Sequence, residues 1–194
     1  MRENFAYSTV FTFALAFVLA LALAWIYEVT APQVSLNQQR DLAKATLQSL
    51  GLEGTDNPVQ AFEKQFGKAP MAAARLEETT VNGETVKVLQ FSGMGLWDRI
   101  DGIISVNSDV SKIIGLSIIE QKETPGLGGR ISEMEFQEQF RGEEIADKIN
   151  MLASTGGDYS DNRSDSAFDA VSGATLTSTE FAKIVNDAIE ELRN

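Results

Sequence analysis

The sequence of 194 residues contains no cysteine and no histidine. Without cysteine, the chain has no thiolate nucleophile, no disulfide, and no iron–sulfur or zinc site built on thiolate ligands. Without histidine, it forms neither a Ser-His-Asp triad nor a histidine haem ligand. These absences disfavour hydrolase chemistry by the protein alone. They leave carboxylate chemistry, or a bound cofactor that supplies its own reactivity.

Basic residues are also scarce, since 16 Lys and Arg stand against 28 Asp and Glu, a formal net charge of −12. Nucleic-acid binding depends on neutralising phosphates with basic side chains, so this balance argues against that function. With 43% hydrophobic residues the chain can bury a core. Its length suits one domain of about 150 residues plus an anchor.

The longest uncharged stretch is apolar and runs from Asn4 to Tyr27. About 20 such residues in a helix cross a hydrocarbon layer of about 30 Å. Tyr7 at one end, and Trp25 with Tyr27 at the other, match the aromatic belts of membrane interfaces. We therefore predict a transmembrane helix at 7–27 that anchors the protein in a membrane.

The charges that flank this span predict its orientation. Arg2 and the amino terminus precede it, which places residues 1–6 in the cytoplasm. A linker at 28–34 then leads to an extracytoplasmic domain at 35–194. A signal peptide cleaved after Ala22-Leu23-Ala24 is the alternative, which the length of the apolar run disfavours.

Helical patterns follow the span. Pro32 is expected to end the membrane helix. Ser35 to Leu50 then forms a separate helix terminated by Gly51, because Leu and Ala residues recur on one side and Ser35 can cap it. A short helix is expected at Gln60 to Phe66.

From Leu76 the pattern changes to strands. Thr85 to Phe91 alternates and follows Asn82-Gly83, a strong hairpin-turn signal. Two further apolar strands are expected, at Asp101 to Val106 and at Lys112 to Glu120. The sequence therefore predicts an α+β domain, with an antiparallel sheet flanked by helices from both ends of the chain.

The C-terminal segment predicts an amphipathic helix. Apolar residues recur at helical spacing at Phe181, Ile184, Val185, Ala188, Ile189 and Leu192. Thr177 and Glu180 have the spacing of a capping box, which predicts that the helix starts near Thr177. Residues 172–176 would then form the turn that leads into it.

That turn is a candidate phosphate site. A helix N-terminus presents free N–H groups and the positive end of the macrodipole, and both favour an anion. Gly173 lets the backbone approach a ligand, and Ala174 adds little bulk beside the Thr175 hydroxyl. The alternative is an ordinary capped loop, because short motifs often match by chance.

A second glycine-rich stretch, Glu123-Thr124-Pro125-Gly126-Leu127-Gly128-Gly129, directly follows the third expected strand. Pro-Gly is a type II turn signature, and three glycines in four positions allow close approach to something flat. By itself the stretch fits turn chemistry and ligand contact about equally.

The string Asp169-x-x-Ser172-Gly173-Ala174-Thr175 resembles the flavinylation motif of the FMN-binding domain. The G subunit of Rnf complexes and the C subunit of sodium-pumping NADH:quinone reductases share this domain. In that family a flavin transferase joins FMN from FAD to the last threonine through a phosphoester. The resemblance implies that Thr175 holds one covalent FMN, with Asp169, Ser172, Gly173 and Ala174 as recognition positions.

The glycine stretch resembles a second marker of the same family, in which Glu-Thr-Pro-Gly-Leu-Gly precedes a phenylalanine-rich helix. Phe136 and Phe140 follow here at helical spacing. From the chemistry of the loop, we expect the flavin ring to be bordered by Thr124, Gly126, Leu127 and Gly128, together with Leu176 and Leu96. The helix that begins at Thr177 would stabilise the phosphate.

The resemblance implies a membrane-anchored electron-transfer subunit in a bacterial or archaeal cell membrane. Its partners would be other membrane subunits, the bilayer and, for maturation, the flavin transferase. An Rnf G subunit, part of an ion-translocating ferredoxin:NAD oxidoreductase, fits the short chain best, and a quinone-reductase C subunit is the alternative. Two interpretations from other classes stay open: a free-standing membrane-anchored flavoenzyme and a non-catalytic membrane scaffold.

A cation site could be imagined from Asp158, Asp161 and Asp165. Their spacing does not match a calcium loop, which needs a glycine at its sixth position and a glutamate at its twelfth. We therefore expect a solvated loop and no metal.

Overall fold

The computed structural model describes residues 2–52, 54, 56–70, 76–154 and 159–194, with side chains from residue 5 and without that of Leu76. The chain divides into two compact units, Met1–Gln38 and Gln39–Asn194.

The first unit consists of a helix that continues into the second: α1 spans Arg2–Ser49. Side chains 5–30 are exposed, although most are large and apolar. The segment Phe5–Ser49 contains a stretch long and apolar enough to cross a membrane, by length and composition. The observed helix therefore agrees with the predicted span in type, while the orientation stays a prediction.

The expected helix end at Pro32 is wrong, because Pro32 lies inside α1. A proline within a helix removes one backbone hydrogen bond and costs about 3 kcal/mol. Strong helix formers stand on both sides, with the apolar span before it and the Leu- and Ala-rich stretch to Ser49 after it. Residues 28–34 and 35–49 are therefore parts of one helix.

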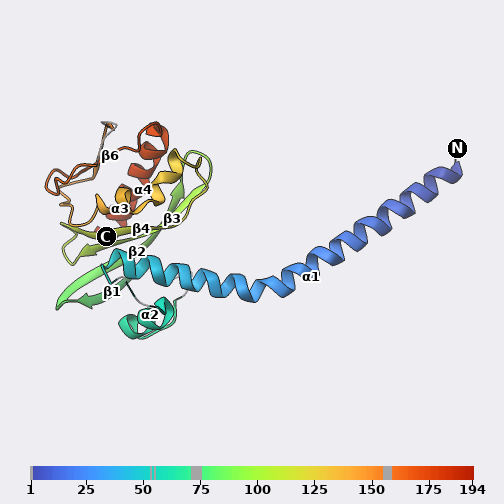
Figure 1. The fold of residues 1–194 in the computed structure, drawn as a ribbon, viewed down its shortest axis with the longest axis horizontal. Coiled ribbons are helices and arrows are strands. Elements are labelled where there is room, and N and C mark those ends of the chain that lie inside the picture. The colour runs from blue at the N-terminus through green and yellow to red at the C-terminus, as the bar shows by residue number, and fades with distance from the viewer. Residues whose placement is uncertain (1, 53, 55, 71–75, 155–158) are drawn as a thin grey trace. The chain divides into compact units, whose positions relative to one another are not determined.

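A four-stranded antiparallel sheet forms the centre of the second unit, in the order β1 (Leu76–Val81), β2 (Glu84–Met94), β3 (Arg99–Asn107) and β4 (Ile113–Glu120). Figure 1 shows these strands as the green and yellow arrows. Asn82 and Gly83, with φ angles of 54° and 88°, form the predicted turn between β1 and β2. The predicted α+β class is confirmed.

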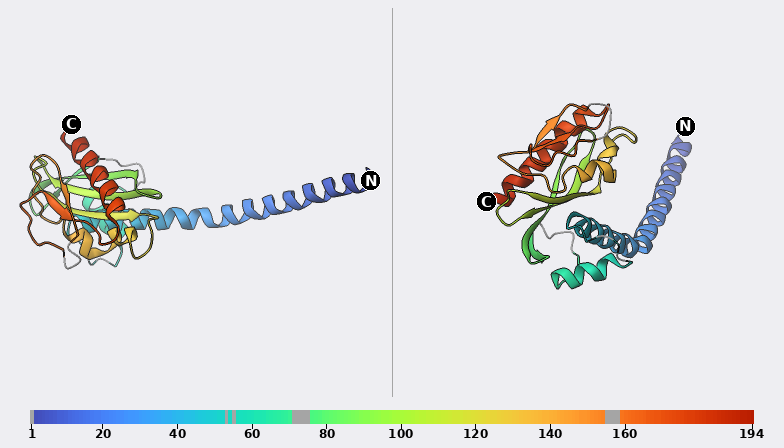
Figure 2. Two further views of the ribbon diagram at one scale, coloured as in Figure 1. Left: turned by 90° about the horizontal axis from the view of Figure 1, so that it is seen from above. Right: turned by 60° about the vertical axis from the view of Figure 1, so that its left-hand side comes forward.

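Alternation along β2 sends side chains to two separate cores. Leu89 and Phe91 belong to the core that the C-terminal helix α4 (Thr175–Arg193) covers. Val86 and Val88 point to the opposite face and pack with residues such as Leu42 at the end of α1. Helices from the two ends of the chain pack on the sheet, as predicted, and the structure shows that they cover opposite faces. Figure 2 shows α4, in red, lying across one face.

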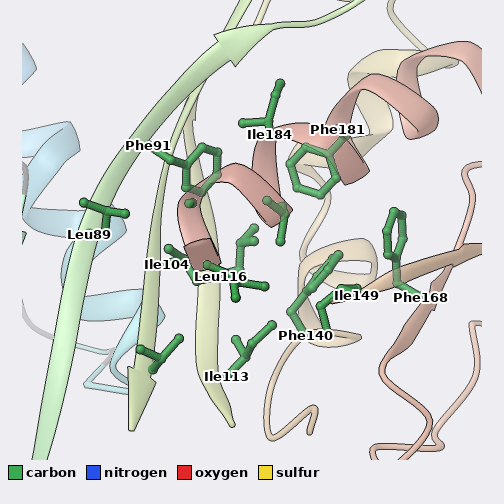
Figure 3. Close-up of a cluster of buried hydrophobic side chains, with 14 of the residues drawn as sticks. Leu89, Phe91, Ile104, Ile113, Leu116, Phe140, Ile149, Phe168, Phe181 and Ile184 are labelled. Atoms are coloured by element: carbon green, nitrogen blue, oxygen red, sulfur yellow. The ribbon is translucent and has the colours of Figure 1, made fainter. Parts of the chain in front are cut away.

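The core under α4 is rich in phenylalanine. Phe136 in the short helix α3 (Met134–Glu138) lies 5.5 Å from Phe181 between ring centroids, and Phe140 lies 5.8 Å from Phe181. Figure 3 shows Phe91 and Phe181 between β2 and α4, with Phe140 and Phe168 further from β2. Fully buried aromatic side chains contribute strongly to such a core. The core holds α4 firmly in place.

Three smaller elements complete the unit. The predicted short helix is α2 (Pro58–Phe66), which ends at Gly67 with a φ of 70°. A 3₁₀ helix at Gly128–Ser132 precedes α3. Two short parallel strands, β5 (Asn150–Leu152) and β6 (Ala167–Asp169), were not predicted, because three-residue strands carry no readable alternation.

Candidate functional site

The site is built around the first turn of α4, which begins at Thr175 rather than near Thr177. Ala174 is the N-cap residue and makes no side-chain capping bond. Ser178 supplies polar partners instead: its Oγ accepts the Val171 N–H at 3.0 Å and donates to the Ala174 carbonyl at 3.1 Å. Thr175 and Leu176 therefore lie within the helix and not in the preceding turn.

The predicted capping box is also wrong. Thr177 is buried, and its Oγ1 donates to Glu123 Oε2 at 2.7 Å. Glu180 pairs with Lys183 at 2.7 Å. The local pattern assigned the Thr177 hydroxyl to a helix cap. In the structure this hydroxyl instead donates to a carboxylate 54 residues away in the sequence.

An open pocket of about 280 Å³ lies beside this first turn. Three separate segments line it: the β2–β3 connection, the glycine stretch after β4, and the start of α4. The lining residues are Leu96, Thr124, Leu127, Gly128, Gly173, Ala174, Thr175, Leu176 and Thr177. The fold thus brings both glycine-containing motifs to one pocket.

Exposure differs sharply between neighbouring residues of the pocket. Thr175 is exposed, and 65% of Leu176 is accessible to solvent. The amides of the first helical turn have no partner inside an α-helix, so they are available to a bound anion. The Thr175 hydroxyl therefore combines accessibility with a favourable position for a phosphate.

Two glycines fit the walls of this pocket together. A Cβ on Gly128 would lie 2.5 Å from Thr177 Oγ1, so any side chain there would push the loop away from α4. Gly173 has a φ of 75°, which side chains rarely allow, and a Cβ there would lie 3.3 Å from Leu127 Cδ2. The close approach of loop and helix thus requires Gly128, and the backbone conformation before α4 favours glycine at position 173.

Three of the predicted site residues lie outside the pocket lining. Asp169 is buried at the end of β6, where its Oδ2 accepts the Ser160 N–H at 2.7 Å and its own N–H donates to Gln139 Oε1 at 2.7 Å. Ser172 is exposed in the turn before α4, and Gly126 has a φ of 72° at the tip of its turn. In this structure Asp169 orders the chain that leads to Thr175.

Glu123 and Trp97 belong to the site although neither was predicted as a site residue. Glu123 is only 4% exposed, and its Oε1 accepts the Trp97 N–H at 2.9 Å. The Trp97 side chain is 69% exposed beside Leu96. Glu123 opens the glycine-rich stretch in the sequence, but only the fold shows what its carboxylate contacts.

A surface ion pair also connects two of the pocket segments. Lys122 Nζ lies 3.3 Å from Asp98 Oδ2. The pKa of Asp98 is lowered, first by the hydrogen bond from the Arg99 backbone N–H and then by Lys122. Both side chains are well exposed, so the pair adds little stability.

The acidic loop shows no metal centre in the described part of the chain. Asp158 lies outside the described residues. Asp161 lies 3.8 Å from Arg163, and Asp165 accepts from Asn162 at 2.7 Å. Among the described residues, no group of three or more Asp and Glu is placed to hold a metal ion.

The region of the chain that forms the pocket is similar to a known protein family. Residues 95–190 match the model of the FMN-binding domain. The matched region runs from the β2–β3 connection almost to the end of α4, so it includes all three segments of the pocket.

Two relatives represent the kinds of protein that the chain resembles. It is 35% identical to the C subunit of the Na⁺-translocating NADH-quinone reductase of Pasteurella multocida over 111 residues, which are 57% of this chain and 43% of the relative. It is 28% identical to the G subunit of the proton-translocating ferredoxin:NAD⁺ oxidoreductase complex of Clostridium ljungdahlii, over 91% of this chain and 85% of the relative. The chain thus spans about half or less of the C-subunit relatives.

Solved structures share the fold. The C subunit of the Na⁺-translocating NADH-quinone reductase from Parabacteroides distasonis superposes with a TM-score of 0.65 at 22% identity, covering 83% of this chain and 95% of that one. NqrC from Shewanella oneidensis gives 0.58 at 19% identity, covering 81% and 99%. Residues 95–190 of the chain thus match an FMN-binding domain, and these two solved structures share its fold.

Proposed function

We propose that this protein is a membrane-anchored electron-transfer subunit that carries one FMN, joined by a phosphoester to the Thr175 hydroxyl. In the attachment reaction, the Thr175 oxygen bonds to the FMN phosphorus of FAD, the bond between the two phosphates breaks, and AMP leaves. A separate flavin transferase catalyses this step. Asp169, Ser172, Gly173 and Ala174 form the sequence that the transferase recognises.

The position of Thr175 is the observation that carries this proposal. Its side chain is exposed at the first residue of a helix of 19 residues, so an enzyme can reach the hydroxyl. The first-turn amides and the helix dipole then stabilise the phosphate group that remains attached. An ordinary capped loop does not require an accessible threonine at this place.

The pocket beside Thr175 suits a flat, largely apolar ring. Leu96, Leu127 and Leu176 supply apolar surface from the three wall segments, and Gly128 brings backbone close to the space between them. Thr124 adds a hydroxyl group at one wall, and Thr177 lines another. Gly126, with a φ of 72°, shapes the turn between Thr124 and Leu127. FMN supplies redox chemistry by accepting one or two electrons, so the chain needs no acid or base of its own there.

The N-terminal helix supports membrane anchoring. Its exposed apolar side chains at 5–30 need a covering, and a hydrocarbon layer is the simplest one for a helix of this composition. We propose that residues 1–6 lie in the cytoplasm and that the FMN domain lies outside. Covalent attachment then prevents loss of the flavin from that compartment.

We assign the protein to an ion-translocating ferredoxin:NAD oxidoreductase complex of the Rnf type, with other membrane subunits as partners. The alignment with the G-subunit relative supports this choice, since it extends over 91% of the chain. A quinone-reductase C subunit is the second candidate, supported by the higher identity of 35% over a shorter region.

The first test measures intact mass and in-gel flavin fluorescence under denaturing conditions. The full chain and Thr175→Ala are each co-expressed with a flavin transferase. Thr179→Ala is the matched control, because Thr179 lies one turn further along α4, outside the pocket lining, and its hydroxyl donates to the Thr175 carbonyl at 2.8 Å. We expect one added FMN and a fluorescent band in wild type and in the control, and neither in Thr175→Ala.

Other outcomes favour the alternatives. A colourless wild-type chain in cells that contain the transferase supports a non-catalytic scaffold. Sustained turnover with a small acceptor by the purified protein alone supports a free-standing flavoenzyme. Purification of the tagged chain from its native membrane then distinguishes the two complexes, because Rnf predicts ferredoxin-dependent NAD⁺ reduction and the other predicts quinone reduction.

A further inference from the structure

Glu123 is a buried carboxylate that the proposed function leaves without a role. Its two oxygens bind different parts of the chain: Oε1 accepts the Trp97 N–H at 2.9 Å, and Oε2 accepts the Thr177 hydroxyl at 2.7 Å. Both carboxylate oxygens of Glu123 thus act as hydrogen-bond acceptors. Glu123 therefore ties the β2–β3 connection and the first turn of α4 to its own loop.

This tie lies directly behind the pocket wall. Thr177, the partner of Oε2, lines the pocket, and a Cβ on Gly128, another lining residue, would lie 3.1 Å from Glu123 Cβ. On the other side, a Cβ on Gly95 would lie 2.6 Å from Glu123 Oε1. Glycines on both sides leave room for the carboxylate, and a side chain at either position would displace it.

No cation neutralises this carboxylate within the described part of the chain. Its neighbour in sequence, Lys122, pairs with Asp98 at 3.3 Å and with Glu120 at 3.7 Å. Among the described residues, the donors to the Glu123 side chain are two neutral groups, the Trp97 N–H and the Thr177 hydroxyl. In a buried environment of reduced dielectric, such a charge acts over a longer distance than it does in water.

We propose that Glu123 is a positioning residue of the flavin site, which holds the three pocket walls together and whose negative charge lowers the reduction potential of the FMN bound beside them. This inference rests on the proposed function. Reduction adds electrons to the ring, and a fixed negative charge behind the wall opposes that addition. The same carboxylate sets both the geometry of the walls and the electrostatic field inside them.

The test separates the charge from the hydrogen bonds. Glu123→Gln removes the charge but keeps the shape: its amide oxygen accepts the Trp97 N–H, and its amide nitrogen donates to Thr177 Oγ1. Thr177→Val removes one hydrogen bond and keeps the charge, and Thr177→Ser restores that bond. Glu120→Gln controls for the loss of any nearby charge, because Glu120 is exposed.

Two quantities are measured on the full chain. The first is the midpoint potential of the attached FMN in a spectroscopic redox titration. We expect Glu123→Gln to raise the ratio of reduced to oxidised flavin at a fixed potential about tenfold, or about 30 mV for a two-electron couple. Glu120→Gln should leave it unchanged, and Thr177→Ser should stay closer to wild type than Thr177→Val.

The second quantity is the hydrogen-exchange rate of the Trp97 amide in chains made without flavin transferase. We expect faster exchange in Glu123→Ala, where no acceptor remains, and near-wild-type exchange in Glu123→Gln. If wild type acquires no FMN with the transferase, the proposed function fails and this inference fails with it. If wild type acquires FMN but Glu123→Gln matches Glu120→Gln in potential, or Glu123→Ala exchanges like wild type, only the inference is overturned.

Discussion

The body and the first turn of helix α4 are held by different forces. From Phe181 to Leu192 the helix buries six apolar side chains against the sheet and the phenylalanine cluster. In the first turn, the buried side chains are those of Thr177 and Ser178, each held by a directed hydrogen bond, while Thr175 and Leu176 remain exposed. Packing thus fixes where the helix lies, and hydrogen bonds fix how its start faces the pocket.

This division means that stability and cofactor attachment are separable along one helix. Apolar packing is non-directional and scales with buried area. Hydrogen bonds depend on distance and angle, so they position groups to within tenths of an ångström. Changes in the body should therefore alter the free energy of unfolding, and changes in the first turn should mainly alter the pocket.

The largest effect on stability is expected from Phe181→Ala. Phe181 is fully buried and contacts the rings of Phe91, Phe136, Phe140 and Phe168. Removing such a ring leaves a cavity and costs about 3–5 kcal/mol. Urea unfolding of the detergent-solubilised chain, followed by near-ultraviolet circular dichroism, measures this loss.

Lys183→Ala is the matched control in the same turn, because Lys183 is exposed and pairs only at the surface with Glu180. It should change the free energy of unfolding by less than about 0.5 kcal/mol. A loss in Lys183→Ala as large as that in Phe181→Ala would mean that the body of α4 does not depend on its buried face.

An intermediate effect is expected from Ser178→Ala. The Ser178 hydroxyl is buried and accepts the Val171 N–H, so its removal leaves a buried donor unpaired at a cost of about 1–3 kcal/mol. Thr179→Ala should cost less, because its hydroxyl donates to its own helix near solvent. The same unfolding assay compares the two variants. Equal losses of stability would mean that the buried Ser178 hydrogen bond contributes no more than the Thr179 bond near solvent.

Glu143 offers a smaller effect that depends on pH. It is fully buried on a segment beside β4, and its Oε2 has no hydrogen-bond partner among the described residues. Burial raises its pKa, an effect that the hydrogen bond from the Ala167 N–H partly offsets. The folded chain thus holds this proton more tightly than the unfolded chain does.

The consequence for stability has a definite sign. The stabilising contribution of protonated Glu143 is complete below the pKa of the unfolded chain, and it is lost as pH rises through the raised pKa of the folded chain. Glu143→Gln should flatten this dependence, seen as melting temperature against pH, whereas Glu144→Gln, an exposed neighbour, should not. If the melting temperature of Glu143→Gln still depends steeply on pH, another titrating group causes that dependence.

The smallest effect on stability is expected from Thr175→Val. The side chain is exposed, so the free energy of unfolding should change by less than about 0.5 kcal/mol. Attachment of FMN should nevertheless be lost completely, because the accepting hydroxyl is gone. Intact mass and urea unfolding on the same preparation test both halves; a large loss of stability would contradict the separation of the two regions.

Sequence patterns predicted the parts of the fold that local physics determines. The apolar spacing from Phe181 to Leu192 identified the buried face of α4, and Asn82-Gly83 identified the first hairpin. Both signals lie within a few residues of the structure they specify. The antiparallel sheet and the helices on its two faces followed from combining them.

The errors arose where distant parts of the chain decide the outcome. The start of α4 was misplaced because Thr177 bonds to Glu123 rather than to its own helix, and sequence spacing cannot show that partner. The predicted helix end at Pro32 was wrong because the cost of one proline was considered without the stabilising contribution of the helix formers on both sides. For the site, the resemblance identified Thr175, whereas the roles of Glu123 and Trp97 needed the fold.

The hydrogen bond between Glu123 and Thr177 joins residues 54 positions apart, and the pocket needs the β2–β3 connection as well. Contacts so distant along the chain form late in folding, because the intervening loop must first be closed. A chain that has not closed this contact therefore lacks the assembled pocket, although residues 169–175 are already present in its sequence. The pocket is thus a property of the completed domain and not of the motif alone.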